Sequence, residues 1–317
     1  MTEPAVPRIR FGWRAAATLA LTLIVLLLLV RGFGGTGDFV SAVRRARPSW
    51  VGVAFAAATA CVWLTVVRWQ LVLGGMGRTL RFGRALEVVL ASWPLALVMP
   101  SRANDLLRAV AVRDVVPLAV GTGSILAEKA IDLLVLLAYA ALGAALSGLW
   151  PLGALLAAAL VAEIVVLALV VTRRSWLESL PWLRARPRVV EELFGALSSL
   201  RRSPMRLVSI AGVSLVIRVL TVAVTHALLV AVGADVTLAQ TLMLWPTAVL
   251  AGIAPLTLGG MGTRDATFIA LVAAQGTHVD ASAVLAATMG YSAVAMWSFA
   301  IVGLPFMVRE TLSFRRA

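Results

Sequence analysis

Residues 151–172 read PLGALLAAALVAEIVVLALVVT and contain one charged side chain, Glu163. Such a run matches the roughly 20 apolar residues that an α-helix needs to cross a bilayer. Five further segments have the same character, at residues 13–30, 50–67, 124–147, 207–232 and 282–307. The pattern lacks the alternating short strands of a membrane β-barrel. The sequence therefore predicts an all-α, polytopic integral membrane bundle with about six spanning helices.

The composition argues against the common soluble classes of protein. Of the 317 residues, 61% are hydrophobic and 14% are charged, and the mean hydropathy is +0.96. Soluble globular proteins average roughly 45–50% apolar and 25% charged residues. A water-soluble enzyme, a disordered chain and a disulfide scaffold are therefore not expected, and the single cysteine, Cys61, cannot form an intrachain disulfide.

The basic residues predict the orientation in the membrane. They outnumber the acidic residues by 28 to 15, and all except Lys129 are arginine. Most lie between the apolar runs, where arginine sets topology and meets anionic head groups, so no nucleic-acid partner is expected. With the N-terminus inside, most arginines, Arg68 among them, fall on the cytoplasmic side. We expect a multi-pass protein of a bacterial-type plasma (inner) membrane, with both termini cytoplasmic and residues 13–30 retained as a helix.

Two apolar stretches, residues 85–100 and 238–255, are irregular because each carries a Trp-Pro pair. Proline breaks the helical hydrogen-bond ladder, and irregular backbone at membrane depth is stable only when it is buried in protein or lines a wet cavity. Both termini stay on one side only if both stretches fold back. The sequence therefore predicts two re-entrant broken-helix hairpins, near residues 85–115 and 238–275, that enter from opposite sides.

We expect residues 1–317 to form a single membrane domain with two halves, 1–172 and 207–317. The order of Trp-Pro, proline and Arg/Asp recurs in both halves, which suggests an inverted repeat of the kind transporters use. The proline spacing differs between the halves, so the repeat is left open. Residues 173–206 form a cytoplasmic basic linker with apolar positions at helical spacing, suited to lying on the membrane surface. A plain topological linker and a lipid-binding role both fit it.

Charged side chains at membrane depth define the first candidate site group, because a charge at mid-bilayer costs at least ~2.5–3.5 kcal/mol. Arg102, Asp105 and Arg108 follow Pro100 at intervals of three residues, so they share one side of a helix. Arginine offers forked donors that match phosphate. The group predicts a cradle for a lipid phosphate, and an interfacial ion-pair cluster is the alternative.

The second group is Glu128, Lys129 and Asp132, in which the two carboxylates are one helical turn apart. Two carboxylates and one ammonium leave a net negative charge or one shared proton. The group would bind a counter-ion, carry a proton or pair with the arginines of the first group. A structural salt bridge that fixes helix packing is the alternative.

The third group is a glycine-rich turn. Gly259, Gly260 and Gly262 precede Arg264 and Asp265, and glycines let backbone amides approach a ligand. A helix that starts near residue 263 would also direct its positive end at an anion.

Three secondary candidates lie inside predicted spanning helices. Arg218 and His226 are eight residues apart and face roughly the same way on one helix. Glu163, alone in its helix, is the expected partner of Arg218 if the two helices are neighbours. A lone histidine is more often a packing residue than a ligand.

Several signatures are missing from the sequence. It has no Gly-x-x-x-x-Gly-Lys-Ser/Thr loop, no His-Glu-x-x-His and no Gly-x-Ser-x-Gly. Two histidines and one cysteine make a zinc site improbable. We expect no catalytic residues, no metal, no cofactor and no ATP-driven pumping by this chain alone.

Three motifs in order resemble the flippase-like family of the lysylphosphatidylglycerol synthase transmembrane region, the membrane domain of the multiple peptide resistance factor. The family's proline-led Gly-Arg-x-Gly-Asp/Glu-x-x-Arg is similar to Pro100-Ser-Arg-Ala-Asn-Asp-Leu-Leu-Arg108, with both glycines replaced. Its Glu-Arg-x-x-Asp resembles Glu128-Lys-Ala-Ile-Asp132, and its Pro-x-x-x-Gly-Gly-x-Gly-x-Arg-Glu resembles residues 255–265 with aspartate for glutamate.

The resemblance implies movement of an anionic, aminoacylated or polyprenyl-phosphate lipid between leaflets. The full synthase adds a soluble aminoacyl-transfer domain; because this chain ends at Ala317, we expect no enzyme activity and no lysyl-lipid synthesis. Partners would be membrane lipids with phosphate head groups, and a homo-oligomer or an envelope-enzyme partner is left open. The alternative function is a non-transporting accessory or regulatory subunit of an envelope lipid or glycosyl-transfer enzyme. An intramembrane enzyme acting on lipid phosphate is weaker, because no nucleophile–base pair is evident.

Overall fold

A computed structural model describes residues 13–32, 35–96, 105–173, 175, 178, 187–254, 256–276 and 280–316. Five helices within these ranges are long and apolar enough to cross a membrane, and a sixth span results if the bent pair α1 (Trp13–Gly32) and α2 (Gly35–Arg44) counts as one. The five are α3 (Pro48–Gly75), α6 (Leu118–Leu146), α7 (Trp150–Thr172), α11 (Pro204–Val232) and the continuous run of α14 (Ala281–Ser292), the π-helical η3 (Ala293–Trp297) and α15 (Ser298–Arg316). The predicted polytopic helical membrane fold is confirmed.

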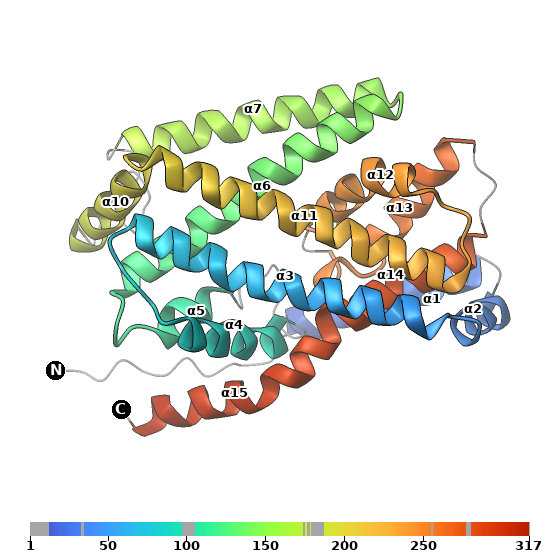
Figure 1. Cartoon of the computed structure of the whole chain (residues 1–317), viewed down its shortest axis with the longest axis horizontal. Coiled ribbons are helices and arrows are strands. Elements are labelled where there is room, and N and C mark those ends of the chain that lie inside the picture. Colours follow the sequence, from blue (N-terminus) through green and yellow to red (C-terminus); the bar gives the residue numbers. More distant parts are fainter. Residues whose placement is uncertain are drawn as a thin grey trace.

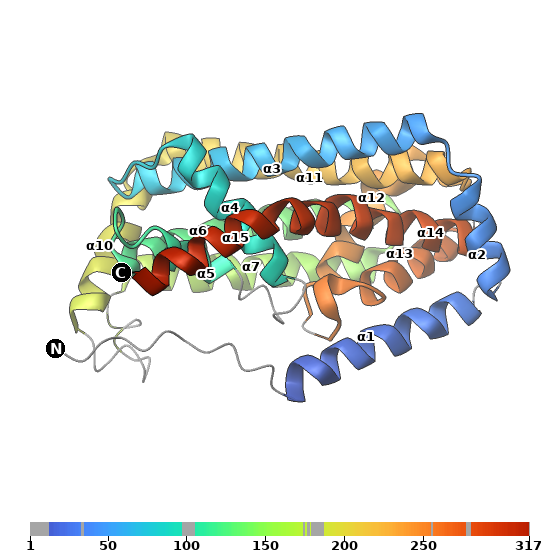
Figure 2. The same cartoon turned by 90° about the horizontal axis from the view of Figure 1, so that it is seen from below.

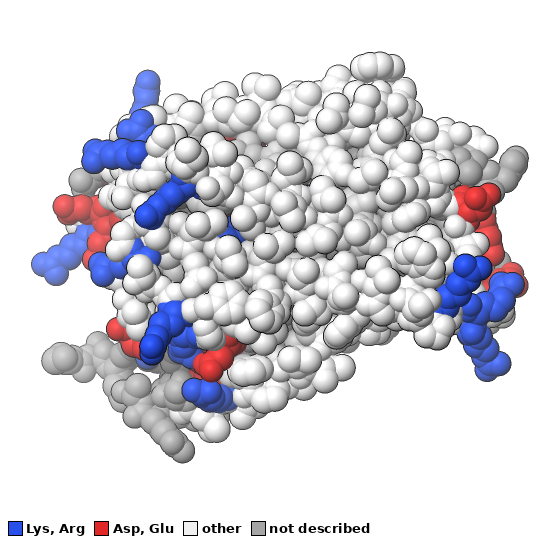
Figure 3. Space-filling view, in the orientation of Figure 1, with Lys and Arg blue, Asp and Glu red and all other residues white. Residues whose placement is uncertain are grey.

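The surface of the bundle matches a bilayer. The long helices run along the longest axis of the molecule (Figures 1 and 2). Charged side chains gather at the two ends of that axis, and an uncharged belt lies between them (Figure 3). Exposed apolar residues from several helices form this belt, among them Leu142, Leu155, Ile164 and Ile301. Such a surface is stable only against hydrocarbon.

Four shorter helices form two hairpins. The first hairpin has α4 (Phe82–Ala96) and α5 (Leu106–Ala111), and the second has α12 (Leu238–Ala251) and α13 (Thr263–Ala274). α4 and α12 start at opposite ends of the molecule, and each stops near its middle before the chain turns back (Figures 1 and 2). This is the arrangement that the sequence predicted for two re-entrant hairpins, whose depth in a bilayer stays a prediction.

The Trp-Pro prolines do not end their helices. Pro94 lies inside α4 and Pro246 lies inside α12. α4 continues past Pro94 to Ala96 and α12 continues past Pro246 to Ala251, so neither proline ends its helix. Such prolines are tolerated in membrane helices because neighbouring helices compensate for the lost backbone hydrogen bond.

The two halves pack on each other reciprocally. The order of a long helix, a hairpin and a second long helix occurs twice, as α3 to α6 and as α11 to α15, and α3 and α11 lie side by side in opposite directions (Figures 1 and 2). Each short entering helix then packs on the long helix of the other half. A Cβ on Gly143 of α6 would come within 2.1 Å of the Met243 carbonyl in α12, and a Cβ on Gly303 of α15 within 2.2 Å of the Leu90 carbonyl in α4. Small residues permit such close backbone approach between membrane helices, and the reciprocity supports an inverted repeat.

The central linker contains the expected amphipathic helix, α10 (Pro187–Arg201). Its apolar face does not lie free for the membrane surface, as the sequence suggested. Val190, Leu193, Ala196 and Leu200 are buried, and α10 packs against α6, α7, α11 and α3. The helix therefore covers the end of the bundle and leaves its arginines outside.

Candidate functional site

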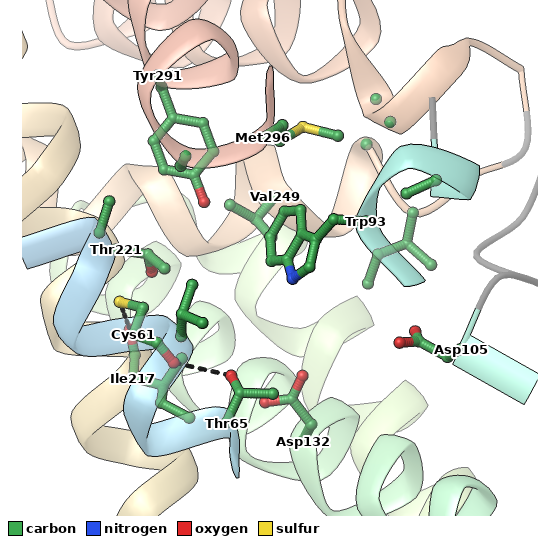
Figure 4. A pocket seen from close by; sticks show the side chains of 18 of the residues that line it. Cys61, Thr65, Trp93, Asp105, Asp132, Ile217, Thr221, Val249, Tyr291 and Met296 are labelled. Carbon is green, nitrogen blue, oxygen red and sulfur yellow. Dashed lines mark hydrogen bonds between the residues drawn. The ribbon is translucent and has the colours of Figure 1, made fainter. Parts of the chain in front are cut away.

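A cavity of about 230 Å³ lies between the two hairpins and is lined by residues of both halves. Its walls come from α3, α4, α5, α6, α11 and α12, from the turn before α13, and from the segment around the π-helix. Trp93 lies in the middle of the view in Figure 4, with Tyr291 and Met296 on one side and Thr65 and Asp132 on the other. The cavity is where the irregular backbone of the hairpins can be stable at membrane depth.

Glu128 and Asp132 project from one face of α6 and hold three arginines. Glu128 is fully buried and accepts from Arg68 Nη2 at 2.8 Å and from Arg108 Nη2 at 2.7 Å. Asp132 accepts from Arg68 Nη1 at 2.8 Å and from both Nε and Nη2 of Arg218. Helices α3, α5, α6 and α11 are thereby joined in one buried ionic network.

Asp105 connects the first and second predicted groups. Its carboxylate lies 3.4 Å from Arg108 Nη1 and 2.9 Å from Lys129 Nζ. The guanidinium of Arg108 also lies over the ring of Trp69, 4.4 Å from the ring centroid. Trp69 is fixed in turn by a 3.0 Å hydrogen bond from Nε1 to Ser124 Oγ. The α5 arginine is thus held from below by an aromatic ring and from the side by carboxylates.

Arg264 has a similar setting in the second half. Its Nη2 donates to Asp265 Oδ1 at 2.8 Å, to the Thr288 carbonyl at 3.1 Å and to Ser292 Oγ at 2.8 Å, and its Nε donates to Asp265 at 3.1 Å. The guanidinium lies 5.3 Å from the ring centroid of Trp245 and 4.7 Å from that of Tyr291. Both halves therefore present a buried arginine that rests on tryptophan and is oriented by a carboxylate.

The glycine-rich turn before α13 is shaped by its own side chains. Gly259, Gly260 and Gly262 all have positive φ, which glycine adopts without steric cost. The amide of Gly262, the residue before α13, donates to Asp265 Oδ2 at 2.9 Å, so this carboxylate of the first turn holds the end of the glycine-rich turn. The expectation that the start of α13 directs its positive end at an external anion stays a prediction.

A family model described as Lysylphosphatidylglycerol synthase TM region matches residues 15–303. The chain belongs to this family. A search of the curated proteins gives no match. The match includes residues 100–108, 128–132 and 255–265, which carry the three motifs, and it supports a membrane domain.

In this lysylphosphatidylglycerol synthase TM region, the structure brings most of the predicted site residues to one cavity. Those that line it are Asp105, Arg108, Lys129, Asp132, Gly259, Gly260 and Arg264, together with the secondary candidate Arg218. Glu128, Asp265 and Gly262 are not among the lining residues; they hold the arginines and the turn in place from behind. Arg102 lies outside the described residues.

The secondary candidates of this family member do not share one site, and Arg218 does not have the partner that the sequence suggested. Arg218 pairs with Asp132 and not with Glu163, because α7 packs along α6 and α10 on the outside of the bundle. His226 does not line the cavity that Arg218 lines. Its Nδ1 lies 3.2 Å from Thr241 Oγ1 on α12, so it contacts the second hairpin as a packing residue.

Arg68 is the site residue that sequence reasoning missed. Counted as a cytoplasmic arginine, it lies inside α3, lines the cavity and bonds Glu128, Asp132 and, at 3.1 Å, Ser214 Oγ. A signal was present, because the apolar run continues past Arg68 through Trp69 to Leu73. An arginine followed by another turn of apolar helix is inside the span and not at its end.

Proposed function

We propose that this chain is a lipid translocator that moves a lipid with a phosphate head group between the membrane leaflets. The head group would cross through the cavity while the acyl or prenyl tails stay in lipid. The two hairpins, which enter from opposite ends, would open the cavity to one side and then to the other. The role is one of binding and movement without catalysis.

The observation that carries this proposal is the cavity with its five basic side chains. Arg68, Arg108, Lys129, Arg218 and Arg264 line a hollow in the middle of the bundle, between two broken helices. Charge at this depth is costly, and guanidinium groups match the geometry of phosphate oxygens. Ion pairs that served packing alone would need no hollow beside them.

The site differs from the one expected from the sequence in which basic residues are available to bind phosphate. Arg108, Arg264 and Arg102 were expected to bind phosphate, with the acidic residues balancing their charge. Arg108 is enclosed by Glu128, Asp105 and Trp69, whereas Lys129 and Arg264 have donors beyond those that their carboxylates use. We therefore assign the first contacts with phosphate to Lys129 and Arg264, and extend the proposal to Arg102 from its motif alone.

Reconstitution tests the proposal. The purified chain is placed in liposomes that contain a tail-labelled phosphatidylglycerol, and bleaching by dithionite measures the labelled fraction in the outer leaflet. We expect the wild type to speed exchange over protein-free liposomes, and Lys129→Gln, Arg264→Gln and Arg102→Ala/Arg264→Ala to slow it at least tenfold. Arg44→Ala, an exposed arginine at the end of α2, is the matched control. Exchange unaffected by these site variants would refute the site.

The alternative is a non-transporting accessory or regulatory subunit of an envelope enzyme. The extent of ion pairing favours it, since the network alone would hold α3, α5, α6 and α11 together. The two functions separate in the same assay. An accessory subunit would not raise the rate of lipid exchange above that of protein-free liposomes. Lys129→Gln would then leave this rate unchanged as long as the protein stays folded.

For the location, we propose a bacterial-type plasma membrane with both termini in the cytoplasm. The end of the molecule with α10 and the α3–α4 turn exposes Arg78, Arg81, Arg201 and Arg202. This excess of arginine supports that orientation. Labelling of single cysteines introduced at Arg81 and at Asp235, in a Cys61→Ser background, with an impermeant reagent on intact cells would test it.

A further inference from the structure

The carboxylates at the cavity are fully occupied by groups of the protein itself, and this narrows the class of substrate. Each of the four carboxylates at the site has both oxygens bonded to groups of this protein: Asp105 to Arg108 and Lys129, Glu128 to Arg68 and Arg108, Asp132 to Arg68 and Arg218, and Asp265 to Arg264 and the Gly262 amide. An ammonium group would have to displace a guanidinium or the lysine to reach a carboxylate.

Hydrogen-bond donors and positive charges are in excess at the site. Five basic side chains face four carboxylates, which leaves one positive charge among the described residues. Two buried donors close to the cavity, Nε of Arg68 and Nε of Arg108, have no hydrogen-bond partner in the described part of the chain. The bonds of Arg264 use Nε and Nη2 and leave its Nη1 donors for a ligand. Among its charged side chains, the site therefore has donors without a partner but no carboxylate oxygen without one.

The aromatic rings offer no second route for an ammonium. Cations are attracted to aromatic faces, but guanidinium groups already lie over Trp69, Trp245 and Tyr291. Trp93, which also lines the cavity, packs at an angle to Phe299. One ring in a site with an excess positive charge does not compensate for the repulsion of another cation.

We propose that the substrate of this cavity is an anionic phosphodiester lipid whose remaining head group is neutral and hydroxylated, and that amine-bearing head groups are excluded. This rests on the proposed function and names its substrate class. Phosphate oxygens supply acceptors and the missing negative charge, and hydroxyls bond to the neutral groups on the wall. Those groups are the hydroxyls of Thr65 and Thr221 and the indole N–H of Trp93.

The head-group preference is tested with the full chain in phosphatidylcholine liposomes and three lipids with the same labelled tail. The lipids are phosphatidylglycerol, phosphatidylethanolamine and lysyl-phosphatidylglycerol. We expect phosphatidylglycerol to exchange at least tenfold faster than either amine-bearing lipid. Equal rates for all three would overturn the inference and leave the translocator intact. If none of the three lipids exchanges faster than in protein-free liposomes, the proposed translocator function is overturned.

A binding measurement keeps the inference testable without transport. The melting temperature in neutral detergent is measured with dihexanoyl forms of phosphatidylglycerol and phosphatidylethanolamine, because a ligand that binds the folded state raises it. We expect a rise with the glycerol lipid alone. An equal rise, or none, with both lipids would overturn the inference.

Variants at Lys129 test the cause of the selectivity. Lys129 forms one ion pair, to Asp105, and its side chain is one-third exposed, so its replacement disturbs the buried network least. Lys129→Met removes a cation from Asp105 and should lower the rate ratio of phosphatidylglycerol to phosphatidylethanolamine at least threefold. Lys129→Arg keeps the charge and should keep the ratio. A ratio that is the same in both variants would contradict the charge argument.

Discussion

Arg218 on α11 donates from two of its nitrogens to the carboxylate of Asp132 on α6, and this pair joins the two halves of the protein across the cavity. Asp132 holds Arg68 on α3 at the same time. One carboxylate therefore fixes two guanidinium groups that belong to different halves. A movement of the halves against each other has to stretch or exchange this contact.

Replacing Asp132 should destabilise the bundle strongly. Asp132→Ala leaves Arg68 and Arg218 buried beside too few acceptors, and breaking a buried ion pair from one side costs about 3–5 kcal/mol. We expect a clear fall in the melting temperature of the detergent-solubilised protein. Asp235→Ala, at an exposed position, is the control. Asp132→Leu/Arg218→Met should lose less than the sum of its single variants; a melting temperature of Asp132→Ala equal to wild type would contradict the role of this pair.

Substitution of the glycine at either of the two reciprocal contacts should lower the stability of the protein to a similar extent. Gly143→Ala and Gly303→Ala each place a methyl group on a carbonyl of the opposite half's entering helix. Overpacking of this kind typically costs about 1–3 kcal/mol, and we expect lowered melting temperatures for both. Gly212→Ala in α11 has open space around it and should be neutral or slightly stabilising. If only one of the two variants is destabilised, the packing of the halves is not reciprocal.

Much of the fold could be predicted from local pattern. The length of the apolar runs gives the spanning helices, because it depends only on neighbouring residues. The hairpins follow from the two irregular stretches together with the need to keep both termini on one side. Arg68 shows the limit of prediction from local pattern. Arginine next to an apolar run usually marks its end, and only the continuation to Leu73 reveals that α3 extends well beyond residue 67.

The pairing of the charged residues could not be predicted in the same way. Glu163 and Asp132 both lie in spanning helices, and each has a carboxylate that can pair with Arg218. Which of the two forms the ion pair depends on which helices are in contact. α7 follows α6 directly in the sequence but lies outside the bundle, whereas α11 packs against α6 and α3. The orientation of Glu128 and Asp265 behind the cavity likewise depends on helix rotation, which the sequence pattern does not fix.

The contact between α1 and the glycine-rich turn should control the order of that turn. Thr22 Oγ1 accepts a 2.9 Å hydrogen bond from the Leu258 amide, and both residues are buried. Thr22→Val leaves this amide without an acceptor, which costs about 1–3 kcal/mol. We expect faster hydrogen exchange at Leu258 to Met261. Thr59→Val removes a hydroxyl that bonds within its own helix and should leave exchange there unchanged; equal exchange in the two variants would show that α1 does not hold the turn.

Asp280 should make the start of α14 sensitive to acid. Its carboxylate accepts from the Ser282 hydroxyl at 2.6 Å and from the amides of Ser282 and Ala283. These bonds, the one from the Ser282 hydroxyl above all, lower the pKa of Asp280 below its usual value of 3.8. The cap therefore stabilises fully above that value, and its contribution is lost as the pH falls through the lowered folded-state pKa.

Asp280→Ala should lose about 0.5–2 kcal/mol at pH 7, as expected for a missing helix cap. Its melting temperature should approach that of the wild type at pH 3 and below, because protonation removes the same interaction. Asp280→Asn still accepts backbone hydrogen bonds but does not titrate. It should lie near the wild type at pH 7 and above it in acid. A gap between wild type and Asp280→Ala that is the same at both pH values would mean that the carboxylate charge plays no part in the cap.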